Sequence, residues 1–310
     1  MSKKLASTII SSFFLASVPF SSFAEMRSEL SVGHNTLGFD TGSNTFISSR
    51  GSEASDLKNL HLSGYIADDF NETVGYVVSG KYVNYQASGF DTTNGSNPKD
   101  DTPIQEMSLE ATVLTKISEK DLLGISAGYV AMDVAQDGTD FERKISNTLD
   151  VSFASQYDKF SYMLTAGMTF GESEETQDYL AGANFYGIAL DYQVQDKVNV
   201  GLTYDSFAGE LRDLGSDGIV DHDGDQSGNT ASIYAEYQND LGRWKVGYKH
   251  YEAWSMDPTN GGSTDKANGK SVFVSFSMPF GGQSSKPERM IITQKPNIAE
   301  FVSIAGSIMD

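Results

Sequence analysis

Apolar and polar residues alternate in twelve segments of this chain, and that alternation restricts the fold more than any other feature. Successive side chains of a β-strand point to opposite faces, so alternation predicts strands with one apolar and one polar face. In residues 269–280, GKSVFVSFSMPF, the apolar face is complete, and mostly serines lie between its members. The twelve segments are residues 26–32, 57–67, 73–85, 105–117, 122–132, 145–155, 160–170, 179–194, 198–207, 230–238, 243–254 and 269–280.

The connections between these segments are alternately long and short. The five short connections are residues 68–72, 118–121, 157–159, 195–197 and 239–242. The six long connections, rich in Gly, Asn, Asp, Ser and Thr, are residues 33–56, 86–103, 133–144, 171–178, 208–229 and 255–268. A soluble β-sandwich has no reason to keep this rhythm, whereas it is typical of barrels with short periplasmic turns and longer outer loops.

From Glu25 to Phe280 the chain therefore resembles the bacterial outer-membrane β-barrel proteins, and more loosely the porins among them. The closing segment, which ends in Phe280 after alternating apolar residues, is similar to the assembly signal of that class. Proteins of the class often end at that phenylalanine, whereas this chain continues for 30 residues. The resemblance implies an all-β fold: a transmembrane antiparallel up-and-down β-barrel of about 12 strands. Weak alternation before Leu57 leaves ten or fourteen strands open.

Residues 1–24 have the pattern of a secretory signal peptide. Lys3 and Lys4 precede an apolar stretch, residues 5–20, and Ser22-Phe23-Ala24 forms a small-x-small cleavage site. We therefore expect three parts: a signal peptide at 1–24, an outer-membrane β-barrel at 25–280 and a periplasmic tail at 281–310. The expected location is the outer membrane, where the apolar strand faces would contact lipid.

The composition limits which partners the protein can have. A formal net charge of −20 argues against nucleic acid and against anionic lipid as electrostatic partners. Cysteine is absent, so an exported chain must be stable without disulfides. After the signal peptide no apolar run is long enough for a transmembrane helix.

Aromatic residues gather at both ends of the expected strands, as expected for the two membrane interfaces. On the side of the short turns they are Phe70, Tyr157, Phe160, Tyr192, Tyr237, Trp244 and Phe280. On the side of the long loops they are Tyr82, Phe170, Tyr204, Phe207 and Trp254. The alternative interpretation is that aromatic residues simply favour strands.

The polar strand faces would line the lumen, and their charges bear on function. The charged or ionisable residues with this parity are Glu29, His61, Lys81, Glu110, Lys116, Asp150, Asp191, Asp205, Glu236, Lys245 and Lys249. Twelve strands lie between the filled eight-stranded barrels and the open barrels of sixteen or more, which predicts a narrow passage. We interpret the protein as a porin-like passive channel for small hydrophilic solutes or ions, with a mild preference for cations.

Two other interpretations of this barrel remain open. In the first, the charged residues only hydrate and hydrogen-bond the interior. In the second, the protein is a structural or adhesive outer-membrane barrel that acts through its extracellular loops. Either form could assemble as a homo-oligomer.

Asp221, Asp223 and Asp225 alternate around Gly224 in an acidic connection, and they resemble part of a calcium-binding loop. Hard oxygen ligands at this spacing converge on one cation when the backbone curls. The EF-hand pattern, however, requires Gly and Glu where this chain has Gln226 and Ser232. The alternative is a solvated acidic loop, and we expect no other cofactor.

The sequence does not favour an enzyme. Cysteine is absent, and the histidines are His34, His61, His222 and His250. A nucleophilic serine needs a histidine within hydrogen-bond reach and a third group to orient it, and no local pattern provides this set.

The tail after Phe280 has its own pattern. Residues 281–286 read as a flexible linker, and Pro287 and Pro296 are expected to interrupt further structure. Asn297 and Glu300 resemble a capping box, and apolar residues then recur at helical spacing. We predict a short amphipathic helix at 297–309, which would plug the lumen, bind a periplasmic partner or cover the lower rim of the barrel.

Overall fold

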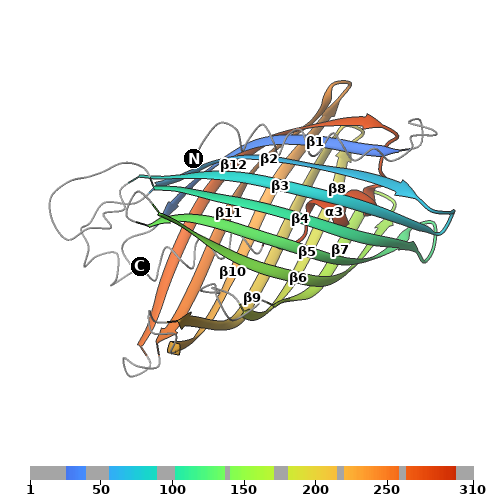
Figure 1. The fold of residues 1–310 in the computed structure, drawn as a ribbon. Helices are drawn as coiled ribbons and strands as arrows, with labels where there is room; N and C mark the ends of the chain where they lie inside the picture. The colour runs from blue at the N-terminus through green and yellow to red at the C-terminus, as the bar shows by residue number, and fades with distance from the viewer. Residues whose placement is uncertain are drawn as a thin grey trace.

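A computed structural model describes residues 26–39, 56–88, 102–136, 140–170, 181–214, 220–257 and 263–297. Within these ranges twelve antiparallel strands close into a barrel, in which each strand pairs with its neighbours in sequence and β1 pairs with β12 (Figure 1). This confirms the predicted up-and-down barrel of twelve strands. The strands are β1 (Arg27–Phe39), β2 (Asp56–Asp69), β3 (Val74–Ser88), β4 (Thr102–Lys116), β5 (Asp121–Gln136), β6 (Asp140–Tyr157), β7 (Phe160–Phe170), β8 (Ala181–Gln195), β9 (Val198–Leu214), β10 (Val220–Asn239), β11 (Gly242–Asp257) and β12 (Ser263–Gly281).

The ring closes where the sequence predicts it. Leu30 of β1 lies opposite Met278 of β12, and Ser28 lies opposite Phe280. On its other side β12 pairs with β11, with Phe276 opposite Trp244. The closing strand therefore joins the first strand and its predicted neighbour, and no strand edge is left unpaired in the ring.

Several strands extend further on the long-loop side than the alternation indicates. β9 continues to Leu214 instead of ending at Phe207, and β10 begins at Val220 instead of Thr230. Beyond the membrane a strand needs no apolar face, so backbone pairing continues after the hydrophobic pattern has ended. The acidic segment predicted to be a loop is therefore largely strand.

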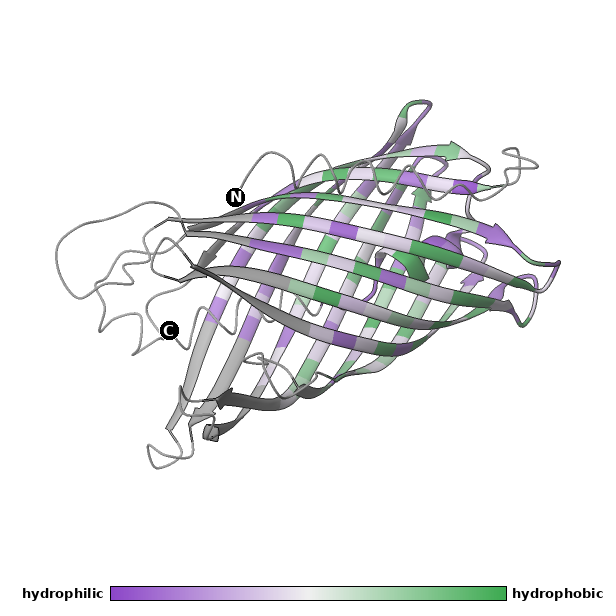
Figure 2. Ribbon diagram, viewed as in Figure 1, coloured by the Kyte–Doolittle hydropathy of each residue, from purple (hydrophilic) through white to green (hydrophobic). Residues whose placement is uncertain are grey.

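Hydrophobic and hydrophilic residues alternate along the strands (Figure 2), and the exposures of their side chains separate the two faces of the barrel. Apolar side chains point outward and are exposed: Leu109 at 50%, Leu164 at 48% and Val272 at 61%. Inward-facing hydroxyls pair across neighbouring strands, as Thr112 does with Ser126. An apolar exterior of this extent suits lipid rather than water. Among the described residues, no helix is long and apolar enough to cross a membrane.

The aromatic residues at the turn side all lie on the outer face and are exposed, whereas the loop-side group is incomplete. Phe170 and Tyr204 are exposed there, but Phe207 is only 2% exposed. Its assignment to the outer girdle is wrong, because it has the same parity as the buried Asp205 and so points into the barrel. The side chain of Trp254 lies outside the described residues.

After β12 the chain forms a helix, α3 (Lys286–Thr293), which corrects the expectation for the tail. Pro287 does not interrupt structure but lies in the first helical turn, where its missing N–H costs nothing. Ser285 caps the helix and forms a capping box with Glu288, so this box, and not the one at Asn297, begins the described helix. The helix predicted at 297–309 lies outside the described residues, apart from Asn297.

A charge placed on the outer face near mid-height tests the membrane assignment. We expect Leu109→Arg to lower the free energy of unfolding in lipid vesicles by about 2–4 kcal/mol, because Arg is most costly near the bilayer midplane. Ile117→Arg, on the same face but just past the turn-side end of β4, should cost no more than about 1 kcal/mol. Denaturant titration in vesicles measures both, and equal costs would contradict the predicted membrane span.

Candidate functional site

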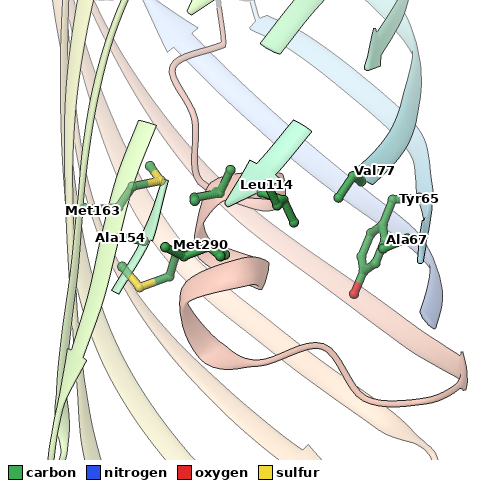
Figure 3. Packing of buried hydrophobic residues seen from close by; sticks show 10 residues of the cluster. Tyr65, Ala67, Val77, Leu114, Ala154, Met163 and Met290 are labelled. Carbon is green, nitrogen blue, oxygen red and sulfur yellow. The ribbon is translucent and has the colours of Figure 1, made fainter. Parts of the chain in front are cut away.

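The tail turns back into the barrel, so that α3 lies in the lumen against β5, β6 and β7 (Figure 1). Met290 and Ile291 of α3 are fully buried in an apolar cluster with wall residues (Figure 3). The wall residues of this cluster are Tyr65, Ala67, Val77, Leu114, Leu122, Ala154, Met163 and Ala189. These inward-facing apolar side chains are exceptions in a polar lumen, and they form the contact surface for the helix.

Two glycines of the wall make room for the tail. A Cβ atom on Gly124 of β5 would lie 2.9 Å from Cγ2 of Ile291. A Cβ atom on Gly187 of β8 would lie 2.6 Å from Cγ of Pro296. The tail therefore contacts the backbone of the wall over a length that extends past the end of α3.

Ion pairs join the tail to the acidic side chains of the wall. Lys286 Nζ lies 2.7 Å from Asp191 of β8. Lys295 Nζ lies 2.8 Å from Glu110 of β4 and 3.0 Å from Asp150 of β6. Burial lowers the pKa of Lys286, and the charge of Asp191 opposes that shift. All three carboxylates are mostly buried, so a cation close to each offsets the cost of removing it from water.

Further hydrogen bonds fix the tail at both ends of α3. At the turn-side rim, Arg27 of β1 donates to Glu288 at 2.9 Å and to both oxygens of Asp69 of β2. Past the helix, Gln294 Nε2 donates to the Tyr234 hydroxyl at 2.7 Å, and that hydroxyl donates to Asp191 at 3.0 Å. The tail is thus attached to several strands around the ring.

Between the tail and the rest of the wall lies a cavity of about 390 Å³, and most of the residues that border it are polar or charged. Seven of the nine predicted pore-lining residues border it: Lys81, Glu110, Asp150, Asp205, Glu236, Lys245 and Lys249. Asp191 is buried and paired with Lys286, and Lys116 is exposed at the turn-side end of β4. Glu29 and His61 also border the cavity, and Glu29 pairs with Arg243.

Sequence reasoning missed several charged residues of this site. Glu106 and Arg243 share the parity of Glu110 and Lys245, so the alternation already indicated their direction. Lys286, Arg289 and Lys295 are missed for a different reason: the sequence leaves open whether the tail plugs the lumen, binds a partner or covers the rim. Because these three bases enter a lumen whose wall carries more acids than bases, they bring the charge of the interior closer to neutral.

The structure places Asp221, Asp223 and Asp225 on β10, where Asp225 lies opposite Glu210 of β9. Residues two apart on a strand are about 6.6 Å apart, so an extended backbone does not supply the curl that the calcium hypothesis assumes. Calcium binding here stays a prediction. A calorimetric calcium titration of the refolded protein tests it, and no heat at millimolar calcium would reject it.

No protein-family model matches this sequence, and no curated protein matches it. Among solved structures, it is similar to an outer membrane channel from Pseudomonas putida F1, with a TM-score of 0.55, 9% identity, and coverage of 82% of this chain and 95% of that one. The translocator domain of the autotransporter NalP from Neisseria meningitidis matches with a TM-score of 0.42, 10% identity, and coverage of 89% and 96%. The Pseudomonas putida toluene transporter TodX matches with a TM-score of 0.46, 9% identity, and coverage of 82% and 89%.

At 9% identity the first of these likenesses shows a shared fold alone. The closed ring of twelve strands, the apolar exterior and the polar interior agree with it. The chain therefore has the fold of that channel, a closed antiparallel β-barrel with an apolar outer surface.

The docking of the tail can be tested with single cysteines, because the chain has none of its own. In Ile291→Cys the thiol should be buried and should react slowly with a maleimide. Adding Lys295→Gln should speed labelling about tenfold or more, because Glu110 and Asp150 lose their cation and each 1.4 kcal/mol of docking free energy is a tenfold change.

Two controls accompany this measurement. Gln283→Cys, exposed before the helix, should label fast with or without the Lys295 substitution. Lys197→Gln, which removes an exposed pair with Asp240 at a turn, should leave labelling of the Ile291 position unchanged. Equal labelling rates at position 291 with and without Lys295 would show that its ion pairs do not hold the tail.

Proposed function

We propose that the protein is a passive channel for small hydrophilic solutes or ions across the outer membrane, and that its C-terminal tail restricts the passage. The observation that carries this proposal is a cavity of about 390 Å³, bordered mostly by polar and charged residues, inside a barrel with an apolar exterior. Side chains of both signs border it, including Lys81, Asp205 and Glu236. Such a lining replaces part of the hydration of a polar solute and offers little to an apolar one. The signal peptide at 1–24 would direct the chain to this membrane.

The position of the tail supports a restricted passage rather than a wide pore. Twelve strands leave an interior between a filled barrel and an open channel, and α3 occupies part of that interior. A solute would pass between the tail and the wall, or it would pass after the tail has moved. Apart from a single bridge between Gly282 and Arg27, the described part of the tail belongs to no strand pair, so α3 can leave the lumen without breaking the barrel.

The charges of the lumen would change if the tail moved. Asp191, Glu110 and Asp150 would lose their cations from Lys286 and Lys295. Water would then hydrate these carboxylates, and an interior with more exposed acids favours cations. We therefore expect the open state to be both wider and more selective for cations than the docked state.

The second candidate is a structural or adhesive barrel that acts through its extracellular loops. Its support is the same inserted tail, because a filled lumen suits a barrel that transports nothing. The two candidates differ in whether any form of the protein carries current across a lipid bilayer.

Deleting Ser284–Asp310 tests the channel and the role of the tail together. In planar bilayers we expect this variant to show single-channel conductance at least about twofold above the full chain, since the lumen loses a helix and its side chains. Its reversal potential in a salt gradient should shift toward that of the cation.

A shorter deletion, residues 298–310, provides the control, because it keeps α3 and Lys295. If the inserted helix restricts the passage, this control should conduct like the full chain. Equal conductance of the full chain and the longer deletion would reject a restricting role for the tail. Absence of stable current in all three proteins would favour the structural barrel.

A further inference from the structure

The ammonium group of Lys295 is surrounded by oxygen acceptors of the barrel wall. Its Nζ lies 2.8 Å from Oε1 of Glu110 and 3.0 Å from Oδ1 of Asp150, and it also donates to the hydroxyl of Ser126. These acceptors belong to three strands, β4, β6 and β5. An ammonium group has three N–H donors and no acceptor, so the wall provides one oxygen for each donor.

The register of the sheet brings these acceptors together. Ser126 of β5 lies opposite Thr112 of β4 on one side and opposite Asp150 of β6 on the other. Glu110 precedes Thr112 by two residues on β4, so both side chains point to the same face. The site is therefore built by neighbouring strands of the wall, and the tail only fills it.

Hydroxyl groups of the wall orient the acceptors. Thr112 Oγ1 donates to Oε1 of Glu110 at 3.1 Å and lies 2.9 Å from Oγ of Ser126. Because the threonine hydroxyl has one proton, which goes to Glu110, Ser126 donates to Thr112 and keeps its lone pairs for the ammonium group. On β6, Ser152 donates to Oδ1 of Asp150 at 3.3 Å. The wall thus positions both carboxylates through its own side chains.

Burial makes this site costly to leave empty. Asp150 is 3% exposed and Ser126 is 1% exposed. In the part of the chain that the structure describes, no base other than Lys295 forms an ion pair with Glu110 or Asp150. When the tail withdraws, two partly desolvated carboxylates remain without a cation. Both border the cavity, so a cation in the lumen can reach them.

The acceptor set fits an ammonium group better than a metal ion. Calcium takes about six to eight oxygen ligands. The group bound here contacts one oxygen from each of three side chains. The described residues contain no group of three or more His, Cys, Asp or Glu side chains that could hold a metal ion. The cation that occupies the site is itself a primary alkylammonium, at the end of the lysine side chain.

We propose that Glu110, Asp150 and Ser126 form a binding site for the primary ammonium group of a small alkylamine, and that Lys295 competes for this site as a tethered ligand. The inference rests on the proposed function and names a class of solute for it, since the site borders the cavity through which a solute would pass. An amine binds here only after Lys295 has withdrawn. By linkage, the amine therefore favours the undocked tail.

Calorimetric titration of full-length Lys295→Ala protein in detergent with n-butylammonium tests this site without any measurement of current. We expect saturable binding about tenfold or more tighter than to the native protein, because the tethered competitor is gone. Tetramethylammonium has the same charge but no N–H donor, so it should bind about tenfold or more weakly than n-butylammonium.

Substitutions in the Lys295→Ala background locate the bound amine. Glu110→Gln and Asp150→Asn should each weaken binding about tenfold or more, because each removes a charged acceptor. The matched control is Asp240→Asn, which removes an acid at an exposed turn and should leave binding unchanged. Heat-modifiable migration on gels confirms that each variant forms a barrel.

A second measurement keeps Lys295 and determines whether an amine displaces it. n-Butylammonium should speed maleimide labelling of Ile291→Cys about twofold or more, at a concentration at which tetramethylammonium has no effect. Labelling of Gln283→Cys, exposed before the helix, corrects for any reaction of the amine with the maleimide. If Lys295→Ala forms no barrel, this measurement decides alone, and an unchanged rate at position 291 rejects the site.

The outcomes separate the site from the channel. Saturable amine binding that depends on Glu110 and Asp150, in a protein that carries no current, would keep the site and reject the channel. Current without amine binding to Lys295→Ala would keep the channel and reject the site. Equal binding of the two ammonium probes would show attraction by charge alone and would overturn the proposal. Tighter binding of calcium or magnesium than of n-butylammonium would show a metal site and would also overturn it.

Discussion

The pairing of β1 with β12 is the constraint on which the rest of the molecule depends. In hydrocarbon an unpaired backbone N–H or C=O costs several kcal/mol, so a sheet that crosses a membrane must close on itself. The register at the closure, Leu30 opposite Met278, also aligns the apolar faces of the first and last strands. Because the strand number is even, the chain leaves the ring on the side where it entered. This brings the tail to the turn-side mouth of the lumen, where Arg27 holds Glu288.

A closed barrel faces a second requirement, which concerns its interior. Polar side chains that point inward lose part of their water and need partners. Hydroxyls meet this need locally, as in the pair formed by Ser152 and Thr165 on neighbouring strands. Among the described residues, Asp191 and Glu110 have no cation within ion-pair distance on the adjacent strands, and the tail supplies one to each through Lys286 and Lys295. The tail is therefore part of the electrostatic balance of the lumen as well as an obstruction in it.

Period-2 alternation is a local property, and it was enough to predict the twelve strands, their faces and the closing pair. The loop-side ends of β9 and β10 were not predictable in this way, because pairing there no longer depends on an apolar face. The inward direction of Phe207 follows from its parity along β9. Its assignment to the outer girdle used only its position near the strand end and did not take this parity into account. The inserted helix is harder to predict from the sequence. Ser285 and Glu288 have the spacing of a capping box, which indicates a helix start. Only the contacts of Met290 and Lys295 with distant strands show that the tail enters the barrel.

Docking of the tail and binding of cations in the lumen are coupled. A cation that binds Asp191, Glu110 or Asp150 competes with Lys286 and Lys295 for the same carboxylates, so by linkage it favours the undocked tail. The strength of this coupling is limited by transport itself, since a solute that binds too tightly does not leave. Carboxylates that bind either the tail or a passing cation meet both demands, because the returning tail displaces the cation.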